Sequence, residues 1–216
     1  MPFTHLVATE EVMKRLGLTL AVLFCLTTSG KAQEAKIQAY SDNISTHGEA
    51  RLLFWDDAAY RSVAELAILY GRPEWKADYE KPGSLDQMTK GKFWRVGQNF
   101  WTLLDTNAPL KIGGQEVGVG MYYLAVHRSE DGATWSLVFL NPSETRSKRL
   151  DAFETATRTG ELSILFKAPL TFSTRIEVTP HLDIALTSNP NDFNKATLDI
   201  KWGKFALTTP VEVMVK

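Results

Sequence analysis

The alternation of hydrophobic and polar residues predicts β-strands over most of the chain. Leu198, Ile200 and Trp202 alternate with Asp199 and Lys201, and this period of two is typical of a strand with one buried face. Many short strands and few helices predict an all-β fold: an antiparallel β-sandwich, jelly-roll-like or a flattened barrel, of roughly ten strands with one or two short helices. We expect strands at residues 51–55, 63–70, 99–105, 110–112, 115–117, 121–127, 134–140, 162–166, 174–179, 182–187, 196–202 and 205–215.

Glycine pairs and polar clusters mark the expected turns. Gly113-Gly114 lies between two short apolar runs and predicts a tight hairpin. Residues 128–132 predict the turn of a second, longer hairpin, and Gly203-Lys204 predicts a two-residue turn between the last two strands.

Three segments have some helical character. A helix is possible within residues 57–69, but the segment runs into Tyr-Gly-Arg-Pro, so we favour a strand that leaves through a turn. Residues 74–92 are polar and predict the longest loop, with one helical turn at 84–88. Residues 150–157 predict a short helix.

The N-terminal segment has the order of a secretory signal peptide. Basic Met13-Lys14-Arg15 is followed by the apolar run 16–26 and by a small-residue end at Ala32, and the apolar run is too short to span a bilayer. We therefore expect residues 1–32 to be a signal peptide and the mature chain to begin near Gln33. Glu10 and Glu11 are atypical of such a leader, so we expect residues 1–12 to be an extension from a misassigned start.

The predicted mature protein is exported, periplasmic or extracellular, with no membrane span after processing. Residues 33–48 are a polar lead-in, and residues 49–216 form a single β-sandwich domain. Cys25, the only cysteine, follows Phe24, which disfavours a lipoprotein cleavage site, and the mature chain then has neither disulfides nor thiolate metal ligands. With 44% hydrophobic residues the chain can bury a core, and a net charge of −1 without a basic block argues against nucleic acid.

Two short blocks place arginine beside aromatic and backbone-bending residues. The first is Tyr70-Gly71-Arg72-Pro73 and the second is Trp94-Arg95-Val96-Gly97-Gln98-Asn99. Together with Gly113-Gly114, the segment 118–123, Trp135 and Asn141, they resemble a bacterial secreted family catalogued as domain of unknown function 2911, best over residues 47–141. The resemblance implies a secreted all-β domain and no established reaction. Many members have Glu after the asparagine, where this chain has Phe100.

The two arginines have two interpretations. If Arg72, Arg95 and Asn99 converge, they form a pocket for an anionic or polyhydroxylated ligand. Alternatively, each arginine braces a loop against the sheet through a paired carboxylate, which the sequence favours because no other chemistry lies nearby. Trp94 belongs to the same candidate site, and Trp75, in a polar loop, is the best candidate for an exposed aromatic that stacks on a sugar.

No catalytic or metal motif accompanies these blocks. His47, His127 and His181 lie far apart, no Gly-x-Ser-x-Gly is present, and the glycine pairs lie between strands instead of before a helix. We expect no metal and no cofactor. The leading prediction is a non-catalytic domain that binds a small molecule, glycan or envelope protein. The alternatives are a hydrolase acting on carbohydrate or a cell-envelope component and a purely structural or assembly domain.

Overall fold

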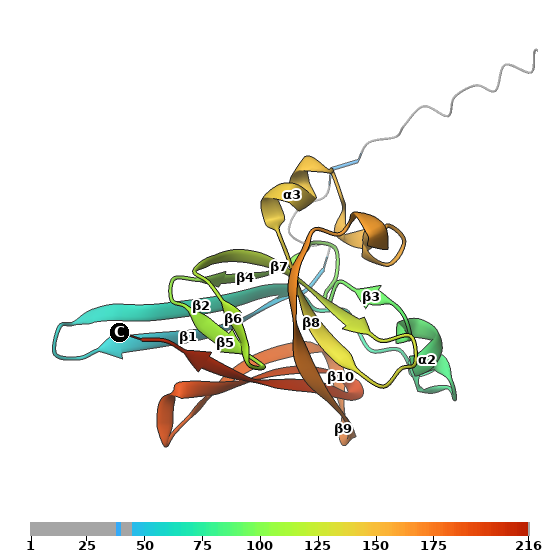
Figure 1. Ribbon diagram of the computed structural model, residues 1–216. Helices are drawn as coiled ribbons and strands as arrows, with labels where there is room; N and C mark the ends of the chain where they lie inside the picture. Colours follow the sequence, from blue (N-terminus) through green and yellow to red (C-terminus); the bar gives the residue numbers. More distant parts are fainter. Residues whose placement is uncertain (1–37, 40–44, 216) are drawn as a thin grey trace, which may run out of the picture. The chain divides into compact units, whose positions relative to one another are not determined.

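The computed structural model describes residues 38, 39 and 45–215, and the chain divides into two compact units, 1–40 and 41–216. The second unit contains every element discussed below (Figure 1). The predicted signal peptide, its extension and most of the polar lead-in lie outside the described residues. The first strand begins at His47.

The described residues form one antiparallel sheet of ten strands. The strands follow the order β1-β2-β4-β7-β8-β9-β10-β5-β6, and β3 pairs with β7 beside this path. Their bounds are β1 (His47–Asp56), β2 (Arg61–Gly71), β3 (Phe93–Trp94), β4 (Thr102–Thr106), β5 (Leu110–Ile112), β6 (Gln115–Val117), β7 (Gly120–Arg128), β8 (Trp135–Leu140), β9 (Ile164–Asn189) and β10 (Asp192–Val213).

The sheet folds over on itself through its longest strand. The start of β9 pairs with β8 as far as Leu170, and from Thr171 onward β9 pairs with β10. Figure 1 shows β9 and β10 passing across β1 and β2 as a second layer. Both layers contribute to one hydrophobic core, with Leu66 and Phe139 from the first and Leu198 from the second. The fold is thus the predicted sandwich, and it is not a closed barrel, because β1 and β6 end the strand path.

Strands β7 and β8 are buried on both faces. Leu124 and Phe139 face the main core, while their neighbours Tyr123 and Val138 belong to a second, smaller cluster. Successive side chains of a strand point to opposite faces, so this cluster lies on the outer side of the sheet. Segment 141–163 contributes Leu150 and Leu162 to it.

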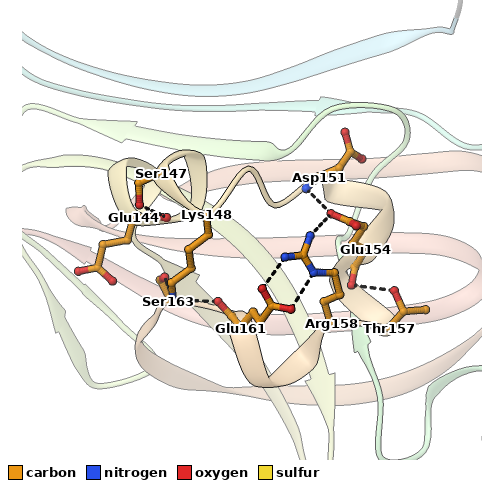
Figure 2. A network of polar contacts seen from close by, with 9 residues as sticks. All are labelled: Glu144, Ser147, Lys148, Asp151, Glu154, Thr157, Arg158, Glu161 and Ser163. Atoms are coloured by element: carbon orange, nitrogen blue, oxygen red, sulfur yellow. Dashed lines mark hydrogen bonds and ion pairs between the residues drawn. The ribbon is translucent and has the colours of Figure 1, made fainter. Parts of the chain in front are cut away.

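Short helices and ion pairs organise segment 141–163. It contains α3 (Pro142–Ser147), η3 (Ala152–Ala156) and η4 (Thr159–Glu161). Figure 2 shows Arg158 between Glu154 and Glu161, each of which it contacts directly. Asp151 completes a capping box with Glu154, which pairs the backbone N–H groups at the start of η3.

The structure confirms several predicted elements. Strand β2 occupies the segment for which a helix was the alternative, and the hairpins β5–β6 and β7–β8 form as predicted. The long loop contains η2 (Ala77–Glu80) and α2 (Ser84–Thr89), and η3 falls within the predicted helix 150–157. Helix α3 was not predicted. Asn141 caps it through two backbone N–H groups, and Pro142 occupies its first turn.

Two predictions about the C-terminal strands are wrong. Residues 162–187 do not form three separate strands, because β9 runs without interruption from Ile164 to Asn189. Gly203-Lys204 is not a turn, because Gly203 lies within β10, opposite Thr179, between two shifts in register. Gly203 has a φ of 60° and the ring of Trp75 lies directly against it, so glycine here permits a bulge and a close contact. No helix among the described residues is long and apolar enough to cross a membrane.

Candidate functional site

The two arginine blocks meet backbone to backbone. Gly71, the last residue of β2, lies so close to the carbonyl of Gln98 that a Cβ atom would collide with it. A Cβ on Gly97 would lie 2.7 Å from Oγ1 of Thr102. Gly71 is required by the close approach that joins the end of β2 to the loop between β3 and β4, and Gly97 is required by the neighbouring side chain of Thr102.

The loop after Arg95 contains two residues in the left-handed region. Val96 has a φ of 45° and Asn99 a φ of 65°. Asparagine tolerates this region, but a β-branched valine does so only when its surroundings hold it there. Val96 is fully buried, and its carbonyl accepts a hydrogen bond of 2.8 Å from Oγ1 of Thr102. The direction of Arg95 is therefore fixed by its neighbours.

An open concavity of about 530 Å³ lies where the two blocks meet. Arg72, Trp94 and Arg95 from the blocks line it together. The other lining residues are Ser45, Thr46, Pro73, Glu74, Lys76, Tyr79, Gly97, Gln98, His181 and Trp202.

Arg72 combines a bracing contact with partial exposure. Its Nε donates a hydrogen bond of 3.1 Å to the carbonyl of Leu182, on β9. Its Nη2 lies 3.9 Å from Oδ1 of Asp183, and the Arg72 side chain is 34% exposed. Gly48 covers its aliphatic stem, since a Cβ there would lie 2.9 Å from the Cδ of Arg72.

Arg95 is held in a similar way. Its Nε donates to the carbonyl of Gly97 at 3.2 Å, and its guanidinium carbon lies 4.0 Å from the centre of the Phe153 ring on η3. Among the described residues its terminal nitrogens form no hydrogen bond or ion pair. Burial lowers the pKa of Arg95, opposed by the charge of Asp151, but an arginine stays protonated. This is a fixed, partly dehydrated cation with unused donors.

The lining of the concavity carries more positive than negative charge. Lys76 joins the two arginines, and Glu74 is the one carboxylate that lines it in the described part of the chain. Glu74 and His181 are partners in an isolated antiparallel bridge, which places their side chains side by side at the rim.

An apolar pocket of about 170 Å³ adjoins the concavity. Tyr79, Trp94 and Trp202 line both spaces, and the rings of Trp94 and Trp202 stack with centres 5.4 Å apart. Helix α2 contributes Leu85 and Met88 to the pocket. The remaining lining residues are Trp75, Thr89, Trp135, Phe172, Ile200, Phe205 and Leu207.

Trp75 is half-buried, not an exposed platform. Its ring packs edge-on against Trp202 and Phe205, and its indole N–H donates to Oε1 of Glu80 at 3.1 Å. It lines the apolar pocket and does not line the concavity.

The structure thus brings together three of the five predicted site residues, Arg72, Trp94 and Arg95. Asn99 does not line the concavity, but its Nδ2 donates to Oγ of Ser45, which does, at 2.8 Å. His181 and Trp202 were not predicted as site residues. Their contact with the blocks depends on how β9 and β10 cross the sheet, for which the sequence carries no local signal.

The described residues contain no group of three or more His, Cys, Asp or Glu side chains that could hold a metal ion. Fold and site define an all-β domain with a cationic concavity beside an aromatic pocket. A family model described as "Protein of unknown function (DUF2911)" matches residues 57–211, and the chain belongs to this family. The match extends well beyond the arginine blocks, into β10. No curated protein and no solved structure matches the chain.

Proposed function

We propose that the protein is an exported, non-catalytic domain that binds an anionic small molecule in the concavity between the two arginine blocks. Export is supported by the order of basic, apolar and small residues at the N-terminus. The periplasm or the extracellular space is then the place where the ligand is met.

One observation carries the binding proposal. Arg72 and Arg95 each use Nε to hold a backbone carbonyl while both line the same open concavity. The bracing bond fixes each guanidinium, so little side-chain entropy is lost when a ligand binds to the remaining donors. A carboxylate or phosphate is the complementary group, because a guanidinium offers it two parallel hydrogen bonds. Bracing and binding are thus compatible roles for the same two residues.

A hydrolase is the second candidate. Glu74 and His181 are paired at the rim of the concavity, and a carboxylate and an imidazole are the groups that general acid–base catalysis uses. In this case, the full-length protein purified after secretion would release reducing ends from glycans or envelope fragments, and Glu74→Gln would abolish the release. Turnover that survives both Glu74→Gln and His181→Asn would exclude this site as its source.

A thermal-shift screen tests the leading proposal. The purified protein is heated with uronic acids, sugar phosphates, carboxylates and soluble envelope fragments, beside neutral analogues of each. We expect at least one anionic compound to raise the unfolding temperature, with no rise for its neutral analogue and none in Arg95→Met. Arg61→Met, at an exposed position at the start of β2, is the control for loss of one positive charge. Equal shifts in Arg95→Met and Arg61→Met would contradict the proposal.

A further inference from the structure

We infer that the apolar pocket behind Trp94 and Trp202 accepts an aromatic ring of the ligand, so that the ligand is an aromatic carboxylate or a similar aryl-bearing anion. This inference rests on the proposed function. The site then has two halves: the concavity holds the anionic group, and the apolar pocket holds the ring. The two halves adjoin, because Tyr79, Trp94 and Trp202 line both.

The volume of the apolar pocket limits the size of the group that it can hold. Its volume is about 170 Å³, and a cavity of about 150 Å³ with an apolar lining is known to stay dry and to hold a benzene molecule. One six-membered ring therefore fits, whereas a long acyl chain or a disaccharide does not.

The chemistry of the lining disfavours a sugar, because three of its polar groups are already used. The indole N–H of Trp202 already donates to the carbonyl of Pro73 at 3.0 Å, and that of Trp75 is used by Glu80. Thr89 donates its hydroxyl to the carbonyl of Leu85 at 2.6 Å. Sugar hydroxyls placed beside these three groups would lose water without gaining partners, which is unfavourable.

The aromatic walls favour an aryl group over an alkyl group. The rings of Trp75, Trp202 and Phe205 already meet at steep angles, with Trp75 edge-on to the other two at centre distances of 5.2 and 5.3 Å. A further ring entering this cluster has the same edge-to-face and offset geometries available, which stabilise aromatic pairs beyond the burial of area.

The positive charge next to the pocket favours an anionic group on the same ligand. Arg72, Lys76 and Arg95 line the concavity, and Trp94, the chain neighbour of Arg95, lines both spaces. An anion attached to the buried ring by a short linker would lie in the adjoining concavity, among these cationic residues. A neutral aromatic compound would fill the pocket and leave the donors unused.

Calorimetric titration of the mature protein, purified after secretion, tests the inference. The probes are phenylalkanoates from phenylacetate to phenylhexanoate, with butyrate, 4-phenylbutanol and 4-cyclohexylbutyrate as comparisons. We expect one chain length to bind at least about tenfold more tightly than butyrate or 4-phenylbutanol, because ring burial and a charge-assisted hydrogen bond each correspond to that factor or more. The cyclohexyl analogue is expected to bind several-fold more weakly, since it lacks the aromatic geometry.

Two variants on α2 locate the ring. Met88→Trp fills the pocket and is expected to weaken phenylalkanoate binding about tenfold or more. Gln87→Trp places the same side chain on an exposed neighbouring position and is expected to leave binding unchanged. If Met88→Trp loses its native fraction, Leu85→Phe narrows the same pocket and takes its place.

The outcomes separate this inference from the proposed function. Equal affinity for butyrate and phenylbutyrate, equal affinity for the cyclohexyl analogue, or no effect of filling the pocket would overturn the aryl site while leaving an anion site intact. Equal affinity for 4-phenylbutanol would overturn the link between the two halves. Failure of every carboxylate to bind would overturn the aryl-carboxylate site, and the proposed function would fall with it only if no anion in the thermal-shift screen distinguished Arg95→Met from the unmodified protein.

Discussion

Gly71 lies against the carbonyl oxygen of Gln98, with no room for a methyl group between them. This contact joins two blocks that are more than twenty residues apart in the chain. It lies next to Arg72 and Arg95, which both line the concavity. The site therefore depends on a backbone contact that only glycine allows.

Substitution of Gly71 by alanine is expected to destabilise the fold. The added Cβ forces the loop 96–99 away from β2, and overpacking of this kind costs about 1–3 kcal/mol. Urea denaturation measures the loss. Gly160→Ala is the matched control, because nothing lies within 4 Å of a Cβ built there. A Gly71→Ala variant as stable as Gly160→Ala would show that the two blocks are not in contact.

Gly203 tests the corrected course of β10. Alanine at this position meets both a left-handed backbone and the ring of Trp75, so we expect lower stability and a changed environment for that indole. Tryptophan fluorescence and unfolding curves measure the two effects together. A solvent-exposed turn at this position would tolerate an asparagine, whereas the packed bulge would not. A Gly203→Asn variant of unchanged stability would therefore show that Gly203 lies in a turn.

The ion pairs around Arg158 predict a specific pH dependence. Hydrogen bonds from Arg158 lower the pKa of Glu161, and hydrogen bonds from the Asp151 backbone and from Arg158 lower that of Glu154 (Figure 2). A carboxyl pKa depressed in the folded state adds stability above its unfolded value, near 4.5, and this is lost as the pH falls through the folded value.

The measurement is the unfolding temperature of the unmodified protein and of Arg158→Met between neutral pH and pH 3. We expect the difference between the two proteins to be largest above about pH 5 and to shrink on acidification. Arg51→Met removes a fully peripheral pair with Glu49 and is the control. A difference that is constant with pH would mean that Arg158 acts through packing alone.

Export has its own test. Intact-mass analysis of the protein recovered from the periplasm or medium should give a chain that begins near Gln33. A retained N-terminus would refute the signal peptide, and with it the proposed location, without affecting the site.

Local patterns were sufficient where a turn is defined by its own residues. Gly113-Gly114 between two short apolar runs predicted the hairpin β5–β6, and Tyr-Gly-Arg-Pro correctly marked the end of β2. The same reasoning failed at Gly203, because a glycine that punctuates a strand pattern indicates either a turn or a bulge. Only the position of Trp75, far away in the sequence, decides between them.

The site was predictable only in part for the same reason. The unusual composition of the two arginine blocks predicted Arg72 and Arg95 as site residues. The partners that determine what these arginines do come from distant segments, namely Leu182 on β9 and Phe153 on η3. The predicted choice between brace and pocket also assumed that one arginine has one role, whereas each arginine here holds a backbone carbonyl through Nε and also lines the concavity.

The most direct test of the central claim is a paired measurement on Arg95→Met. Its unfolding curve in urea and its affinity for the best anionic compound from the thermal-shift screen are measured beside those of the unmodified protein. We predict a cooperative native state that has lost about 1 kcal/mol, for the missing hydrogen bond to Gly97, and an affinity reduced about tenfold or more. A variant with no native fraction would contradict the modest bracing role of Arg95, and one that binds the compound as tightly as the unmodified protein would contradict a ligand site at Arg95.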